Sequence, residues 1–333
     1  MKKRDVTNLP ASVHDRLLKI AKERGAEFQY LLINYALERW LYRMTQSAHR
    51  DRFVLKGAML FAIWSNEPHR STKDLDLLGY GSNSIAEMEG IFREICLVEC
   101  EADGLEMPPA NVRGSVIRED RRYEGVRINL LAMLGKARIP LQIDVGFGDA
   151  VIPPPVEMMY PTLLEYPAPR LHAYRRETVV AEKFHAMVER GIGNSRMKDY
   201  FDLWFFTESF DFDGATLTEA IRVTFERRRT PLPAAVPVGL ADAFGQHPEK
   251  LMQWRAFERK GKLKSGSREL PVVVTRLRDF LMPLVNALGP GQSFAGQWTS
   301  PQFPGENLRG AANRKENRIF RTESLATQSV SYA

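Results

Sequence analysis

Cysteine is scarce in this 333-residue chain, which contains only Cys96 and Cys100. Two thiols four residues apart form neither a C-x-x-C redox motif nor a zinc site, and they cannot staple so long a chain. Long hydrophobic runs are also missing, because charged residues interrupt every apolar stretch well before the ~18 residues that a membrane span needs. The basic start at residues 1–4 is not followed by the apolar segment of a secretion signal. We therefore expect reduced, partly buried thiols and a cytoplasmic protein.

The composition is that of an ordinary globular protein. Apolar residues make up 44% of the chain and charged residues 26%, a balance that excludes a wholly disordered, collagen-like or disulfide-scaffold protein. A chain of this length forms one large domain or two ordinary ones, and its core needs no metal or disulfide to fold.

Acidic residues are few between residues 250 and 278, where nine lysines and arginines face only Glu258 and Glu269. The net charge of this segment is +7, whereas that of the whole chain is +6. The remaining residues therefore sum to −1. Basic surface concentrated in one part of a chain suits a polyanion such as nucleic acid. The alternative is a solvated helical face. The residues that we expect to bind RNA are Lys260, Lys262 and Lys264.

The periodicity of apolar residues predicts an α+β fold with a mixed sheet, N-terminal helices and a C-terminal helical region. Ser12 to Asp15 supply the expected cap of the first helix, and Gly25 its end. The expected strands are residues 53–55, 74–78, 111–119, 125–134 and 139–147. The expected helices are residues 10–48 (in two parts), 85–98, 177–190, 197–207, 217–229, 248–260 and 272–288.

These elements divide the chain into segments. We expect an N-terminal helical segment at residues 1–50, an α/β core at 51–152 and a C-terminal helical domain at 170–290. The proline-rich residues 153–169 are interpreted as an extended connection. Residues 305–333 have few apolar anchors and are predicted to be disordered.

Asp74 and Asp76 are the first residues that indicate chemistry. Side chains alternate along a strand, so an Asp-x-Asp pair places both carboxylates on one face. Adjacent carboxylates repel each other unless a cation lies between them, and Mg²⁺ binds through one or two carboxylates together with substrate phosphates. A glycine turn at Gly57, upstream of the pair, offers backbone N–H groups for those phosphates.

Asp144 is a third candidate, because it stands in the apolar strand 139–147. Buried strands seldom keep an aspartate without a partner. Three carboxylates on neighbouring strands can hold two divalent ions, which stabilise the attacking and leaving oxygens of phosphoryl transfer. The alternative is an aspartate that caps the turn after this strand.

A second group of candidates lies on the expected C-terminal helices. Lys183 has no acid three or four residues further on and is interpreted either as a snorkelling surface lysine or as a contact to a triphosphate. Asp199 and Asp202 share one helical face, close to Arg196 and Lys198. They form either a surface salt-bridge cluster or a further acidic site.

Together these residues resemble the DNA polymerase β-like nucleotidyltransferase superfamily and, more closely, the AbiEii/AbiGii toxin family of nucleotidyltransferases. The resemblance runs from about residue 8 to about residue 302. The motifs that carry it, in order, are residues 53–58 (FVLKGA), 70–77 (RSTKDLDL), 142–144 (QID), 178–183 (TVVAEK) and 196–203 (RMKDYFDL).

The resemblance implies a Mg²⁺-dependent toxin of a toxin–antitoxin system that transfers nucleotides from an NTP to an RNA acceptor, such as the 3′ end of tRNA, and that has a cognate antitoxin. Asp74, Asp76 and Asp144 would bind the metal, Lys183 would contact the triphosphate, and Asp199 or Asp202 would supply a further acid. The implied nucleotide-binding residues are Lys56, Gly57, Ala58, Arg70, Thr72 and Lys183.

One departure from the family pattern concerns the glycine turn. The family has Gly-Gly followed by Ser or Thr, whereas this chain reads Gly57-Ala58-Met59 and lacks the hydroxyl that would bond a phosphate. Two alternatives to RNA nucleotidylation therefore stay open. One is a protein that binds RNA or a partner without catalysis, and the other is an enzyme that nucleotidylates a protein or a small molecule.

Overall fold

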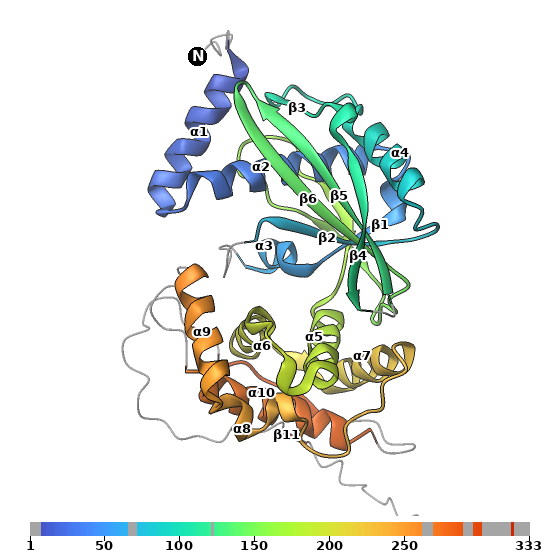
Figure 1. Ribbon diagram of the computed structural model, residues 1–333, viewed down its shortest axis with the longest axis vertical. Helices are drawn as coiled ribbons and strands as arrows, with labels where there is room; N and C mark the ends of the chain where they lie inside the picture. Colours follow the sequence, from blue (N-terminus) through green and yellow to red (C-terminus); the bar gives the residue numbers. More distant parts are fainter. Residues whose placement is uncertain are drawn as a thin grey trace, which may run out of the picture. The chain divides into compact units, whose positions relative to one another are not determined.

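The computed structural model (Figure 1) describes residues 8–65, 72–120, 123–261, 269–288, 296–301 and 321–322. Arg70, Lys262, Lys264 and nearly all of the predicted disordered tail lie outside the described residues. The chain divides into two compact units. The N-terminal unit comprises Met1–Asp149 and Pro154–Arg175, and the C-terminal unit comprises Ala150–Pro153 and Arg176–Ala333. None of the described helices combines the length and the apolar character that crossing a membrane requires.

Two helices open the N-terminal unit, α1 (Leu9–Arg24) and α2 (Phe28–Gln46). Gly25 ends α1 in the left-handed conformation, at φ 61°, as predicted. The expected cap at residues 12–15 is wrong, because α1 begins earlier. Asn8 is its N-cap and accepts the Ala11 N–H at 3.1 Å, and Pro10 occupies the first turn, where its missing N–H is not needed.

An eight-stranded mixed sheet forms the centre of this unit (Figure 1). Its order is β3-β5-β6-β2-β1-β8-β7, with β4 paired to β5. The β2–β6 and β1–β8 pairs are parallel, and the others are antiparallel. The predicted mixed α/β core is therefore confirmed. The strands are β1 (Phe53–Lys56), β2 (Asp74–Gly79), β3 (Leu105–Glu106), β4 (Arg113–Asp120), β5 (Tyr123–Leu134), β6 (Ala137–Phe147), β7 (Val156–Met159) and β8 (Arg170–Ala173).

The proline-rich segment after β6 is not only a connection, because it contains β7, which pairs with β8 at the edge of the sheet. Prolines flank β7 and do not interrupt it, as an edge strand allows. Short helical turns complete the unit: η1 (Arg50–Arg52), η2 (Gly57–Leu60), α3 (Phe61–Trp64) and η3 (Pro109–Asn111).

One face of the sheet is apolar and packs against α2 and α4 (Ile85–Cys96). Phe92 of α4 stacks on Trp40 of α2 with ring centroids 4.8 Å apart and meets Phe53 of β1 at 5.8 Å. Leu77 and Ile143 on the neighbouring strands are also fully buried. Because strand residues alternate between faces, this covering of one face leaves the polar side chains of β2, β6 and β5 on the other.

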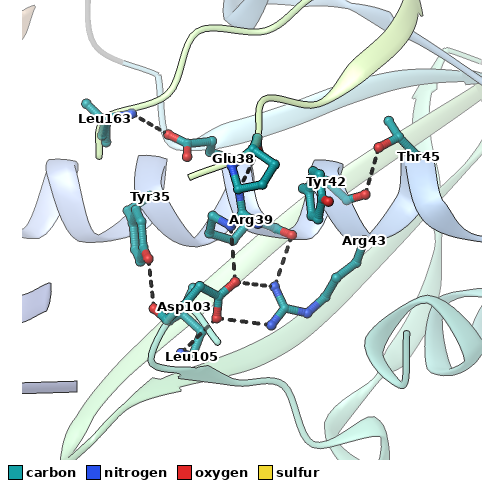
Figure 2. A network of polar contacts seen from close by, with 10 residues as sticks. Tyr35, Glu38, Arg39, Tyr42, Arg43, Thr45, Asp103, Leu105 and Leu163 are labelled. Carbon is teal, nitrogen blue, oxygen red and sulfur yellow. Dashed lines mark hydrogen bonds and ion pairs between the residues drawn. The ribbon is translucent and has the colours of Figure 1, made fainter. Parts of the chain in front are cut away.

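A buried ionic network joins α2 to the loops around it (Figure 2). Asp103 accepts hydrogen bonds from Arg43 at 2.7 and 3.1 Å and from Arg39 at 3.1 Å. Burial by itself would raise the pKa of Asp103, but Arg43, the Leu105 N–H and Arg39 together outweigh it and hold that pKa low. Glu38 is also buried and accepts the Leu163 N–H at 2.7 Å, and burial raises the pKa of its carboxyl to about 8. Both cysteines are free and half-buried, as predicted.

The C-terminal unit is mainly helical. Its core includes Phe280, which meets the rings of Trp298 at 4.8 Å and Phe212 at 5.4 Å. Within the predicted disordered tail, residues 321–322 form a strand that pairs with β10. The helices are α5 (Arg176–Arg190), η4 (Gly191–Gly193), α6 (Met197–Ser209), α7 (Gly214–Arg227), η5 (Val238–Leu240), α8 (Asp242–Gly245), α9 (Pro248–Gly261) and α10 (Leu270–Asn286), and the strands are β9 (Phe212–Asp213), β10 (Gly296–Trp298) and β11 (Arg321–Thr322).

Candidate active site

Four charged residues form a row across the polar face of the sheet. Lys56 of β1 pairs with Asp76 of β2, Asp76 pairs with Asp144 of β6, and Asp144 pairs with Arg127 of β5. Paired residues on neighbouring strands share a face, so two acids lie side by side between two cations. Asp74 lies two residues before Asp76, on the same face and exposed. The structure thus brings together the three carboxylates that the sequence singled out.

The glycine turn lies directly beside Asp76. Gly57 has φ 73°, which L side chains rarely adopt, and it begins the turn η2 after β1. A Cβ atom at Gly57 would stand 2.0 Å from Oδ2 of Asp76 and 2.8 Å from its Cβ. Only glycine therefore lets this turn approach the carboxylate so closely.

Lys56 has an acidic partner that the sequence analysis missed. Its Nζ lies 2.7 Å from Oδ2 of Asp149 and 5.5 Å from the centroid of the Tyr174 ring. The side chain of Asp149 is only 10% exposed. The signal in the sequence is weak, since Asp149 follows Gly148 just after the end of β6 and looks like an ordinary loop residue. The pair fixes the ammonium of Lys56 at the end of β1, immediately before Gly57.

Arg127 is the second residue that sequence reasoning missed. Its Nε donates to Oδ1 of Asp144 at 2.8 Å and its Nη2 donates to Oδ2 at 2.7 Å, a bidentate ion pair. The alternation of Val126, Arg127 and Ile128 along β5 is the signal that could have found it, because it places one cation on the polar face of a strand. Asp144 therefore does not cap a turn, and its partner is the guanidinium of Arg127.

The donor set fits a divalent cation only in part. Among the residues that the structure describes, no group of three or more His, Cys, Asp or Glu side chains is arranged to hold a metal ion. Asp74 and Asp76 are hard oxygen donors on one face, which suffices for a cation that takes its other ligands from phosphates and water. Both oxygens of Asp144 are engaged by Arg127. The role of all three carboxylates as metal ligands stays a prediction, and Asp144 is paired with Arg127 in this structure.

The remaining nucleotide-binding candidates of the N-terminal unit lie at the start of β2 and in the turn η2. The hydroxyl of Thr72 donates to the backbone carbonyl of Asp74 at 3.3 Å, which agrees with a turn-forming role. Ala58 is half-buried in η2 and contributes no hydroxyl. The phosphate contacts of this turn would be backbone N–H groups.

In the C-terminal unit, Lys183 is not a lone cation. Its Nζ lies 2.6 Å from Oδ1 of Asp199 and 2.9 Å from Oδ2 of Asp202, and Nε of Arg196 lies 2.7 Å from Oδ2 of Asp199. Both aspartates are buried, so the surface salt-bridge interpretation is wrong. Burial would raise the pKa of Asp199, but the charges of Lys183 and Arg196 outweigh it and lower that pKa. The cluster keeps a buried carboxylate ionised.

The basic segment is less uniform than its composition indicates. Lys250 is buried beside the ring of Phe244, with Nζ 3.3 Å from Oε1 of Gln253. Arg276 pairs with Glu208 at 3.0 Å, and Arg278 pairs with Asp242 at 2.7 Å. The described basic residues of this segment that are exposed lie on α9: Arg255, Arg259 and Lys260.

Comparison with known proteins identifies the family. The family model described as nucleotidyl transferase AbiEii toxin, type IV toxin–antitoxin system, matches residues 39–275. A candidate nucleotidyltransferase from H. pylori is 14% identical, with 78% of this chain and 95% of that chain covered and a TM-score of 0.46. The JHP933 protein from Helicobacter pylori is 13% identical, with 76% and 91% covered and a TM-score of 0.43. No curated protein matches the chain. Because the family match spans most of its length, the chain belongs to the AbiEii family of nucleotidyltransferase toxins of toxin–antitoxin systems.

Proposed function

We propose that this protein transfers a nucleotide from an NTP to an RNA acceptor, with Mg²⁺ held by Asp74 and Asp76. The observation that carries the proposal is the polar row on β1, β2 and β6, where Asp76 lies against the Gly57 turn. An acidic pair beside a glycine turn suits a nucleotide whose phosphates share a divalent cation with the protein.

The reaction displaces pyrophosphate from the nucleotide. A hydroxyl oxygen of the acceptor loses its proton to water and forms a bond to the α-phosphorus, while the bond from that phosphorus to the bridging oxygen breaks and the electron pair leaves with pyrophosphate. When bound, Mg²⁺ would neutralise charge on the phosphate oxygens. The protein's part is to position the two reactants and to stabilise charge, which accounts for most of the catalysis in phosphoryl transfer.

Lys183 is proposed as the triphosphate contact, as the family resemblance implies. Its ammonium has three N–H donors, and two of its partners are the carboxylates of Asp199 and Asp202. These acids orient the ammonium at the surface of a buried cluster, since the Lys183 side chain is 13% exposed while theirs are 1% and 0% exposed. Asp199 and Asp202 are thus positioning residues in this proposal.

An RNA acceptor, such as the 3′ end of tRNA, is favoured by the exposed cations of α9. Arg255 and Arg259 line a hollow of about 670 Å³ together with Met252 and Glu258. Met252 is 63% exposed there. Guanidinium groups beside apolar surface can pair with phosphates and stack on bases. We infer that the reaction takes place in the cytoplasm, where NTPs and tRNA are found, and that a cognate antitoxin limits it.

The experiment that tests the transferase function is incubation of the protein with each labelled NTP and total RNA, with and without Mg²⁺. We expect Mg²⁺-dependent label in an RNA band, which the Asp76→Asn variant does not produce. Label in protein or in small molecules would redirect the proposal to another acceptor. Absence of label under every condition would favour the second candidate function, a binding protein without catalysis. The observation that supports this candidate is the missing hydroxyl at Ala58.

The RNA part of the proposal has a separate test. Reversal of Lys260, Lys262 and Lys264 to Glu should weaken acceptor binding and flatten its salt dependence, since each lost phosphate contact removes a slope of about 0.7 to 0.9 in a plot of log K against log salt. NTP binding should not change. The same reversal at Lys19, Lys22 and Lys136, three exposed lysines of the N-terminal unit, is the matched control. An unchanged salt slope would mean that the basic segment is a solvated helical face that does not contact RNA phosphates.

A further inference from the structure

The bidentate pair between Arg127 and Asp144 lies in the same row as the proposed metal residues. Asp144 stands between Asp76 and Arg127 in the register of the sheet. Its side chain is 17% exposed and that of Arg127 is 36% exposed, so the pair is partly shielded from water. The guanidinium neutralises one of two neighbouring acids that would otherwise repel each other.

This arrangement blocks Asp144 as a ligand in two ways. Nε and Nη2 of Arg127 occupy one lone pair on each carboxylate oxygen, at 2.8 and 2.7 Å, so a cation cannot chelate both oxygens in that plane. The guanidinium also places a full positive charge beside both oxygens, and it would repel a divalent cation that approached them closely.

We propose that Arg127 is a latch on Asp144: it holds the carboxylate away from the metal site, and a divalent cation binds Asp144 only when the guanidinium moves off. This inference rests on the proposed metal-dependent transferase. Arg127 is then a positioning residue that sets how tightly the resting protein binds metal. The competition is direct, because the guanidinium engages both of the oxygens to which the cation could bind.

Mn²⁺ binding to the full chain without nucleotide tests the latch, measured by titration calorimetry or by the electron paramagnetic resonance of free Mn²⁺. We expect Arg127→Gln to bind Mn²⁺ about three- to tenfold more tightly than the wild type, a range that allows for partial exposure of the pair. Arg138→Gln removes the same charge from an exposed position of β6 and should leave the affinity unchanged. The double variant Arg127→Gln/Asp144→Asn should lose the gain.

The possible outcomes separate the latch from the proposed function. If wild type and Arg127→Gln bind Mn²⁺ equally, the latch is overturned while the Asp74–Asp76 site stands. If neither binds Mn²⁺, the metal assignment fails and the latch fails with it. An equal gain in Arg138→Gln would mean that net charge alone sets the affinity, which also overturns the latch. Should Arg127→Gln unfold, Arg127→Lys keeps the charge without the planar fork and should give an intermediate affinity.

Discussion

Replacing Gly57 by alanine perturbs both the backbone of the turn and the carboxylate of Asp76. The new Cβ would stand 2.0 Å from Oδ2, 2.7 Å from Cγ and 2.8 Å from Cβ of Asp76. A rotation of the Asp76 side chain can move its oxygens but not its Cβ, which the pairing of β1 with β2 holds in place. The strands themselves must therefore shift.

The loss of stability in Gly57→Ala has two parts, and a control substitution at a second glycine, Gly25, separates them. An alanine in the left-handed conformation costs about 1–2 kcal/mol, and overpacking at a site that cannot relax costs about 1–3 kcal/mol more. Gly25 has φ 61° and nothing within 4 Å of its would-be Cβ. Gly25→Ala should therefore cost only the first part, and Gly57→Ala roughly 2–5 kcal/mol in total.

Urea denaturation of the two variants and the wild type gives both values, and nucleotide transfer is measured under conditions where all three are folded. Gly57→Ala should lose transfer, because Asp76 is displaced from Asp74 and from the turn. Gly25→Ala should retain it. The reasoning is refuted if Gly57→Ala is no less stable than Gly25→Ala, or if it transfers nucleotide at the wild-type rate.

Three further predictions concern charged residues. Asp76→Asn should abolish transfer and keep a cooperative unfolding transition, since it removes one of two neighbouring like charges; a wild-type rate would contradict the metal assignment. Lys183→Ala should lower the rate of single-turnover transfer ~100-fold or more, and it should lower the free energy of unfolding by about 3–5 kcal/mol because it removes a cation from two buried carboxylates. Lys183→Arg should recover only part of the transfer rate. Near-normal transfer in Lys183→Ala would exclude the triphosphate contact. Burial raises the pKa of Glu38 to about 8. Between the ordinary pKa of a glutamate and about pH 8, Glu38 therefore keeps its proton in the folded state but has lost it in the unfolded chain. The free energy of unfolding falls as pH rises through that window. Urea midpoints should show this fall in the wild type and in the exposed control Glu106→Gln but show less of it in Glu38→Gln.

The local elements and the acidic pair were determined by the sequence itself. Helices α1 and α2 and the main strands follow from apolar periodicity, which depends only on neighbours along the chain. Two aspartates separated by one residue on a strand share a face, whichever strands it pairs with. The concentration of positive charge after residue 250 is likewise a property of composition. The burial of Lys250 and the pairing of Arg276 and Arg278 are not, because Phe244, Glu208 and Asp242, which they meet, come from other elements.

What decided the partners of the charged residues was the tertiary structure. Arg127 meets Asp144 because a two-residue turn after Leu134 pairs that residue with Ala137 and so sets the whole β5–β6 register. The sequence boundaries of 134 and 139 left this register open, and a slip of one residue would have turned every side chain of a strand to the other face. In the same way, Lys183 of α5 finds Asp199 and Asp202 on α6, because contacts between helices depend on packing that periodicity within one helix does not encode.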